Sequence, residues 1–167
     1  MILKEKIEKD LAEAIKSRKE REISVLRLLK DAIFLKEKEK RYKIFTQKKG
    51  ISEKELEKES QLSDEEIIQV ISSEIKKRKE AILEFEKGKR SDLVKKESEE
   101  IEILRRYLPE QLSEEEIRKM AKEIIDKVKA GNLKDMGKVM QELMPKVKGR
   151  ADGALVSKVV RELLSTQ

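Results

Sequence analysis

The scarcity of helix-breaking residues constrains this fold more than any other feature of the sequence. The 167 residues include six glycines and two prolines. Strands and tight turns need more of these residues than the chain supplies. Leucine, isoleucine and valine recur instead at intervals of three and four, which places them on one face of an α-helix. The sequence therefore predicts an all-α protein, although 46% of its residues are charged.

Two capping boxes and one proline divide the chain. Ser63 begins the sequence Ser-Asp-Glu-Glu and Ser113 begins Ser-Glu-Glu-Glu. In each, the serine and the glutamate three residues later can close reciprocal hydrogen bonds at a helix start. Pro109 ends the preceding helix, because the residue before a proline is disfavoured in the α region. We expect an N-terminal helical domain over residues 1–108 and a small C-terminal domain over residues 109–167.

The N-terminal domain is predicted to contain about four helices, arranged as a bundle or as a pair of helical hairpins. Residues 46–62 contain few apolar side chains and are expected to form an exposed linker or a short solvated helix. A third helix ends at Gly88, and a fourth runs from about Ser91 to Leu108. The expected core ridge of the first helix is Leu3, Ile7, Leu11 and Ile15.

The second helix, from about Arg21, carries two adjacent apolar stripes. Two stripes make a wide apolar face, which is typical of a helix at the centre of a bundle. We therefore expect both stripes to be buried. They are Ile23, Leu26, Leu29 and Ile33, and Val25, Leu28, Ala32 and Leu35.

The C-terminal domain is predicted to contain three helices. The first ends at Gly131, the second begins at Asn132 and is terminated by Pro145, and Asp152 caps the third. A three-helix domain of this size lies near the lower limit for independent folding.

The chain contains neither cysteine nor histidine. This composition excludes disulfides, the usual zinc and iron ligand sets, and Ser–His or Cys–His nucleophilic pairs. Adjacent carboxylates such as Glu99 and Glu100 point apart on a helix, so they and the basic run 76–79 are interpreted as solvated surface. We expect no catalytic residue, no metal and no cofactor, although burial could still tune a carboxylate or lysine for catalysis.

The N-terminus alternates charged and isolated apolar residues, unlike a signal peptide. No segment approaches the roughly 18 apolar residues of a membrane span. A cytoplasmic location is expected, without a membrane partner.

The segment between the last two helices is the most specific candidate site. It contains three basic side chains and two glycines, and it opens onto a helix N-terminus, where free amides and nearby cations suit a phosphate. The alternative is a turn whose glycines adopt positive φ and whose Asp152 caps the next helix. Both interpretations remain open, and Asp152 would compete with a bound phosphate. The candidate nucleic-acid contacts are Lys138, Lys146, Lys148, Gly149, Arg150 and Lys158, and Lys134 could extend the site.

The charge distribution permits a nucleic-acid partner. The formal net charge is +6, and from Lys127 onward there are nine basic residues and four acidic ones. Aromatic residues make up 3% of the chain, so we expect recognition of a phosphate backbone rather than base stacking. Met136, Met140 and Met144 form a stripe that could mark an adaptable binding surface, but gap-filling core is the favoured interpretation.

Four segments of the chain resemble the YqeY family. They lie at residues 84–94, 107–113, 135–140 and 143–153. The resemblance covers nearly the whole chain and is weakest over 45–61. The YqeY family is similar to the tail of the B subunit of the tRNA-dependent amidotransferase, which makes glutaminyl- or asparaginyl-tRNA.

This resemblance implies two helical domains and a tail that faces tRNA. In the amidotransferase, glutamine hydrolysis and the activation step belong to other parts of the complex. We therefore expect a non-catalytic module associated with tRNA or another structured RNA, without a small-molecule substrate. The alternatives are a protein-interaction adaptor with a protein partner, or an accessory to a carbon–nitrogen ligase that uses glutamine as amido-N-donor.

Overall fold

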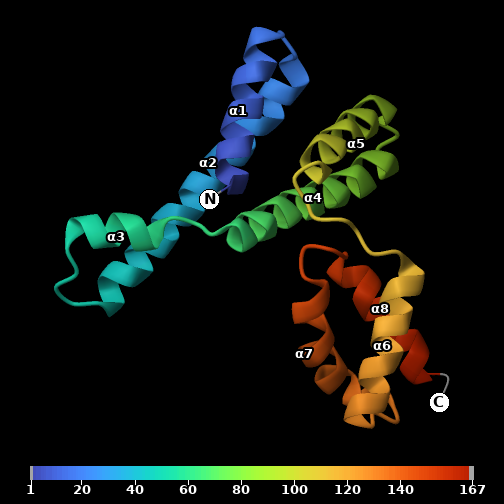
Figure 1. Cartoon of the computed structure of the whole chain (residues 1–167). Helices are drawn as coiled ribbons and strands as arrows, with labels where there is room; N and C mark the ends of the chain where they lie inside the picture. The colour runs from blue at the N-terminus through green and yellow to red at the C-terminus, as the bar shows by residue number, and fades with distance from the viewer. Residues whose placement is uncertain (1, 166–167) are drawn as a thin grey trace. The chain divides into compact units, whose positions relative to one another are not determined.

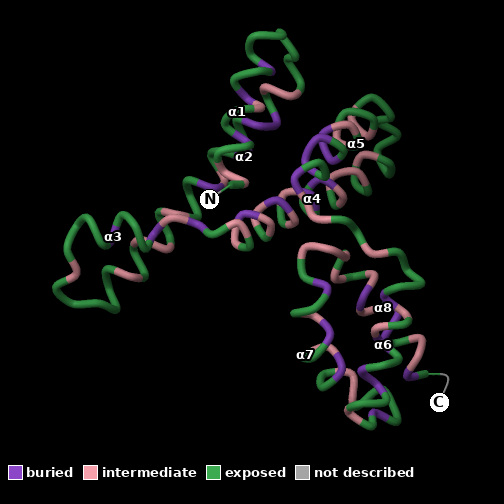
Figure 2. The backbone as a smooth tube through the Cα atoms, viewed as in Figure 1, coloured by how far each residue is buried: buried purple, intermediate pink, exposed green. Residues whose placement is uncertain are grey.

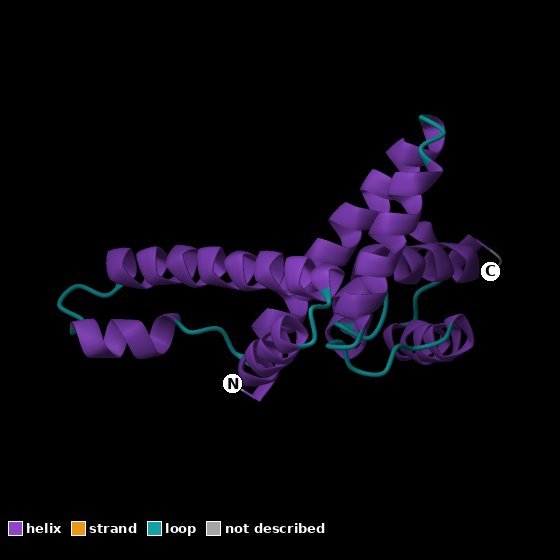
Figure 3. Ribbon diagram, turned by 90° about the horizontal axis from the view of Figure 1, so that it is seen from above, coloured by secondary structure: helices purple, strands orange, loops and turns teal. Residues whose placement is uncertain are grey.

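The computed structural model describes residues 2–165, and all of their regular secondary structure is helical (Figures 1 and 3). Contacts between Cα atoms divide the chain into two compact units, Met1–Leu108 and Pro109–Gln167, called unit 1 and unit 2 below. None of the described helices is both long and apolar enough to span a membrane. Unit 1 contains α1 (Ile2–Lys16), α2 (Glu20–Gln47), α3 (Glu53–Ser60), α4 (Asp64–Lys87) and α5 (Ser91–Arg105). Unit 2 contains α6 (Glu114–Val128), the 3-10 turn η1 (Leu133–Asp135), α7 (Met136–Val147) and α8 (Gly153–Ser165).

Helix α1 packs on α2 through an apolar ridge, as the sequence predicts. Ile7 and Leu11 are buried, but Ile15 is 46% exposed and Ala14 is buried instead. The predicted ridge is therefore wrong at its last position. Each four-residue step advances about 400° around the helix, so the ridge drifts by about 40° per step. By the end of α1 this drift has turned Ile15 toward solvent.

Helix α2 buries one of its two predicted stripes. Leu26, Leu29 and Ile33 of the first stripe lie in the core, together with Val25 of the second stripe. Elsewhere in the second stripe, Leu28 and Leu35 are 51% and 61% exposed. The prediction of a helix buried on a wide face is therefore wrong, because the neighbouring helices of unit 1 leave part of its circumference uncovered (Figures 1 and 2).

The segment predicted as a linker or solvated helix is partly folded into the unit. Helix α2 continues through Gln47, and α3 then lies against α2 with Leu56 and Ser60 buried (Figure 1). A third capping box begins α3, where the Ser52 Oγ accepts a hydrogen bond from the Glu55 amide. The short helix exists, but it is solvated on one side only.

The two capping boxes that the sequence predicts are both present. The Ser63 amide donates to Glu66 Oε2 at 2.8 Å, and the Glu66 amide donates to Ser63 Oγ at 3.3 Å. Ser113 and Glu116 make the same pair of bonds at the start of α6. At the other end of α4, Gly88 is the C-cap as predicted, although Lys89 adopts the left-handed conformation with φ 53°.

A charged cluster is buried between α4 and α5. The Arg78 and Glu100 residues are 8% and 6% exposed, and Arg78 Nε donates to Glu100 Oε2 at 3.1 Å. Arg78 Nη1 also donates to the main-chain oxygen and to Oε2 of Glu74, at 3.2 and 3.1 Å. The prediction that Glu100 and the basic run 76–79 are solvated surface is therefore wrong for Glu100 and Arg78. Both lie where α4 and α5 face each other.

Unit 2 is a three-helix fold around its own core. Two of its predicted helix ends differ in the structure. Helix α6 ends at Val128 with Lys129 in the left-handed region (φ 54°), two residues before Gly131. Pro145 lies inside α7, which continues to the fully buried Val147. Pro145 has no amide to donate to the Gln141 carbonyl, but the burial of Val147 favours two further helical residues. The core contains Ile117, Ala121, Ile124, Ile125, Ala130, Val139, Leu143, Val147, Val156, Val159, Val160 and Leu164.

Candidate nucleic-acid interface

The turn between α7 and α8 has a defined backbone path. After the buried Val147, Lys148 leaves the helix with ψ 125°, and Gly149 has φ 73°, a conformation that favours glycine. The amides of Arg150 and Ala151 both donate to the Val147 carbonyl, at 2.9 and 3.0 Å. The turn is therefore anchored in the core of unit 2 at its first residue.

Residues at the beginning of unit 2 hold this turn from the other side. Gln111 Nε2 donates to the Gly149 carbonyl at 2.9 Å, and the Leu112 amide donates to the Arg150 carbonyl at 2.7 Å. Arg150 Nε donates to the Glu110 carbonyl at 3.3 Å. Gly149 and Arg150, both predicted as nucleic-acid contacts, thus have structural roles in the turn. Sequence reasoning missed Gln111 as a partner of this site.

Lys146 and Lys148 are the predicted contacts that remain available at the turn. Both are exposed, and neither forms an ion pair with any residue in the described range 2–165. The pKa of Glu142 is lowered first by a hydrogen bond from Lys127, and the charge of Lys146 comes last among the causes. Neither ammonium group has to break an ion pair before it contacts a phosphate.

Lys138 and Lys158 lie away from the turn. Lys138 is near the start of α7, and the eight residues that separate it from Lys146 correspond to about 12 Å of helix. It pairs with Asp135 at 3.3 Å. Lys158 follows the start of α8 by five residues and lies 3.9 Å from Glu162. The structure therefore does not gather all six predicted contacts into one site.

The N-terminus of α8 is already capped by a carboxylate. Asp152 Oδ1 accepts a hydrogen bond from the Ala154 amide at 2.9 Å, as expected for an N-cap residue. An anion at this position would meet a negative charge where it needs a free amide. Of the two interpretations left open by the sequence, a turn capped by Asp152 describes the N-terminus of α8. A phosphate would therefore have to bind to the lysine side chains and not to the amides of this helix.

The methionine stripe belongs to the core, which was the favoured interpretation. Met136, Met140 and Met144 are half-buried and pack against the apolar cluster of unit 2. Met144 also approaches the start of α8, where a Cβ placed on Gly153 would lie 3.8 Å from its Cε atom. The stripe therefore helps to fix the spacing between α7 and α8.

Among residues 2–165, no group of three or more acidic side chains is placed to hold a metal ion. The largest pKa shift is that of Tyr107, which burial and a hydrogen bond to Asp10 raise far above its ordinary value. The Tyr107 hydroxyl donates to Asp10 Oδ2 at 2.8 Å and closes the end of α5 onto α1. This arrangement stabilises the fold of unit 1.

Comparison with known proteins gives a family match and two relatives. A protein named altered inheritance of mitochondria protein 41, mitochondrial, from Pyrenophora tritici-repentis is 32% identical over 108 residues, which cover 63% of this chain and 59% of that protein. An uncharacterized protein of Schizosaccharomyces pombe is 45% identical over 51 residues, which cover 30% of this chain and 42% of that protein. The chain thus spans about half the length of the curated relatives that it matches.

The first relative's name places that protein in mitochondria, so a cytoplasmic location for this chain stays a prediction. The family described as Yqey-like protein matches residues 34–164, from the middle of α2 to the last turn of α8. This is the family that the sequence resemblance indicates. The chain belongs to the YqeY-like protein family.

Proposed function

We propose that this chain is a non-catalytic module that associates with tRNA or another structured RNA through unit 2. The observation that carries the proposal is the pair Lys146 and Lys148. Both are exposed, lack an ion-pair partner among the described residues, and lie at either end of the buried anchor Val147. Phosphate contacts of this kind position a nucleic acid without reading its sequence.

The rest of unit 2 supports a phosphate-directed role. From Lys127 onward, basic residues outnumber acidic ones nine to four. Lys138 and Lys158 are 71% and 64% exposed in their side chains, and their single long ion pairs contribute little on a surface. These two lysines would act as peripheral charges on the same RNA. The resemblance to the amidotransferase tail supplies tRNA as the first RNA to test.

The test is a titration of fluorescein-labelled bulk tRNA with the full chain, followed by anisotropy at several salt concentrations between 50 and 400 mM. We expect Lys146→Gln/Lys148→Gln to weaken binding and to reduce the slope of log K against log salt by about 1.5, the value for two lost phosphate contacts. The matched control is Lys119→Gln/Lys122→Gln, which removes two exposed charges from α6 in the same unit.

Two results would overturn the proposal. The first is the absence of measurable tRNA binding at 50 mM salt. The second is an equal loss of affinity in the test pair and in the control pair, which would show that RNA responds only to the net charge of unit 2.

A further inference from the structure

Helix α2 carries most of the large exposed apolar side chains of unit 1. We call Leu28, Phe34, Leu35, Tyr42 and Phe45 the outer face of α2. Their exposed fractions are 51%, 54%, 61%, 72% and 63%. Three of the five aromatic residues in the chain lie on it. Leu28, Leu35 and Tyr42 follow one another at intervals of seven, so they form a line along the helix.

This concentration needs an explanation in a highly charged protein. Isolated exposed hydrophobic residues are common on soluble proteins, but five large ones gathered on one helix favour an interaction site. Leu28 and Phe45 are 17 positions apart, which corresponds to about 25 Å of helix. That length matches the footprint of a second helix lying along the first.

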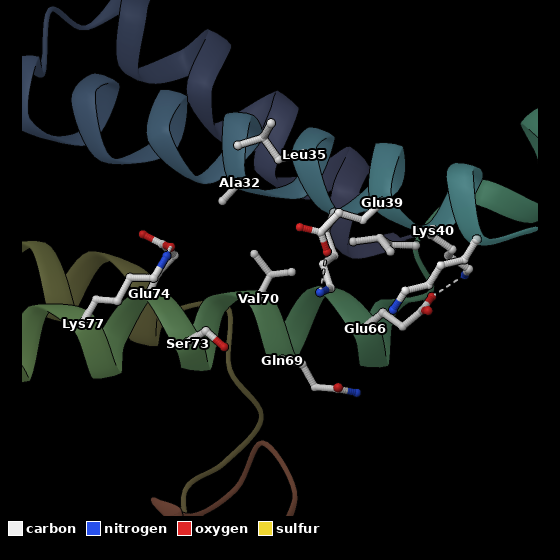
Figure 4. A pocket seen from close by; sticks show the side chains of 13 residues that line it. Ala32, Leu35, Glu39, Lys40, Glu66, Gln69, Val70, Ser73, Glu74 and Lys77 are labelled. Carbon is white, nitrogen blue, oxygen red and sulfur yellow. Dashed lines mark hydrogen bonds and ion pairs between the residues drawn. The ribbon is translucent and has the colours of Figure 1, made fainter.

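A groove adjoins the outer face where α2 and α4 diverge (Figure 4). Its volume is about 610 Å³. Ala32 and Leu35 from α2 and Val70 from α4 line its apolar part, as Figure 4 shows. Ion pairs occupy its margins, including Lys40 with Glu66 at 2.7 Å. An apolar groove with charged margins between two helices is the form that commonly receives an amphipathic helix.

The charges around the distal part of the outer face are not balanced. Lys38, Lys43 and Lys49 have no ion-pair partner among residues 2–165, whereas Glu37 and Glu39 are already paired with lysines. Nearer the start of the face, Arg27 and Asp31 carry opposite charges. An occupant of the distal part must therefore bring negative charge together with apolar side chains. A second copy of the same basic face would be repelled.

We propose that the outer face of α2 and the adjoining groove dock an amphipathic helix with acidic flanks from a partner protein. The aliphatic side chains of Leu28 and Leu35 in the central line favour a protein ridge over stacked bases. The Lys38 ammonium lies 4.6 Å from the centre of the Phe34 ring and already covers one face of it. This proposal concerns unit 1, so it stands or falls independently of RNA binding by unit 2.

The experiment uses two synthetic peptides of about 21 residues, with leucine at the a and d positions of three heptads. One carries glutamate at the flanking positions and the other carries lysine, and both bear fluorescein. Anisotropy titrations with the full chain should show micromolar binding of the acidic peptide and at least tenfold weaker binding of the basic one.

Substitutions on the outer face should act in two distinguishable ways. Leu35→Ser/Tyr42→Ser is expected to weaken the acidic peptide at least tenfold at any salt concentration. Lys38→Glu/Lys43→Glu should weaken it mainly at low salt, because exposed charges are screened at high salt. Phe45→Ala provides a second apolar variant if the first double variant loses helicity by circular dichroism.

Matched controls lie elsewhere in unit 1. Leu83→Ser removes a leucine of α4 that is 57% exposed but does not line the groove. Lys95→Glu reverses an exposed charge on α5. Neither should change the affinity for the acidic peptide by more than about twofold, the scale of a remote surface charge.

Three results would overturn the proposal. The acidic and basic peptides could bind equally well, or the outer-face variants could bind the acidic peptide as the wild type does. Alternatively, tRNA or anionic phospholipid vesicles could bind and lose affinity on Leu35→Ser/Tyr42→Ser while neither peptide binds. That last outcome would assign the outer face to RNA or to a lipid surface.

Discussion

Removing the arginine from the buried charged cluster should destabilise unit 1 severely. Arg78→Met retains most of the side-chain volume but leaves the 6% exposed Glu100 without its 3.1 Å partner. Breaking a buried ion pair by removing one member typically costs about 3–5 kcal/mol, because an uncompensated charge stays buried. The lower end applies here, since Lys96 lies 4.0 Å from Glu100 and offers partial compensation.

A loss of about 3 kcal/mol is measurable without unfolding the whole chain. It corresponds to a roughly 100-fold fall in the hydrogen-exchange protection of the slowest amides in α4 and α5. In a domain of about 100 residues it also lowers the Tm by about 12–20 °C. Hydrogen exchange followed by mass spectrometry separates this effect from unit 2, whose α6–α8 peptides should exchange as in the wild type.

Two companion variants make the reasoning refutable. Arg78→Met/Glu100→Leu removes both charges and should recover at least half of the lost protection, because apolar pairs often replace buried ion pairs without cost. Arg90→Met breaks an ion pair with Asp92 whose side chains are 57% and 63% exposed, and it should have almost no effect. If Arg78→Met/Glu100→Leu were as unstable as Arg78→Met alone, the cluster would act through packing and not through charge.

Three further predictions concern unit 2. Gly149→Ala places a side chain at φ 73° and should cost about 1–2 kcal/mol in urea unfolding while tRNA affinity of the folded protein is retained; an unchanged midpoint would contradict the assigned backbone strain. Lys129→Gly relieves a left-handed lysine at the end of α6 and should stabilise unit 2 by up to about 1 kcal/mol, which a lower midpoint would disprove. Hydrogen bonds from the Ser113 amide and hydroxyl hold the pKa of Glu116 below its usual 4.5. This contribution to stability is complete above pH 4.5 and is lost as the pH falls through the lowered pKa. In Glu116→Gln the urea midpoint of unfolding should therefore fall less steeply with decreasing pH below 4.5 than in the wild type. The same pH dependence in both proteins would exclude the effect.

The helices themselves were predictable because their signals are local. The boxes at Ser63 and Ser113 depend on four consecutive residues, and both are present. The box at Ser52 has the same pattern and could have been found by the same rule. Helix ends were less predictable, since Lys129 accepts a left-handed conformation that the sequence assigns more readily to Gly131.

The burial of individual faces was less predictable, because it depends on distant parts of the chain. Periodicity identifies Leu35 as part of an apolar stripe, but only the positions of neighbouring helices decide whether it is covered. The same limitation hid Glu100, whose charge suggests solvent although its partner Arg78 lies 22 residues earlier.

In the candidate site, one feature was predictable from neighbouring residues and another was not. The N-cap role of Asp152 follows from adjacent residues and was predicted as one of two alternatives. The bond from Gln111 to Gly149 joins residues 38 positions apart, so no local pattern announces it. That bond gives Gly149 a structural role in the turn, so Lys146 and Lys148 remain as the residues that can contact a ligand.

The length of α3 has a consequence for how this part of the molecule opens. Eight residues are too few for a helix to persist alone in water, so α3 depends on the contact that buries Leu56 against α2. If that contact is lost, α3 should unfold as a whole. The last turns of α2 should then fray, because solvent reaches the side of α2 that α3 had covered. The two helices would therefore come apart as one cooperative element, well below the global unfolding free energy of unit 1. The aromatic residues Tyr42 and Phe45 would be disordered in the same event.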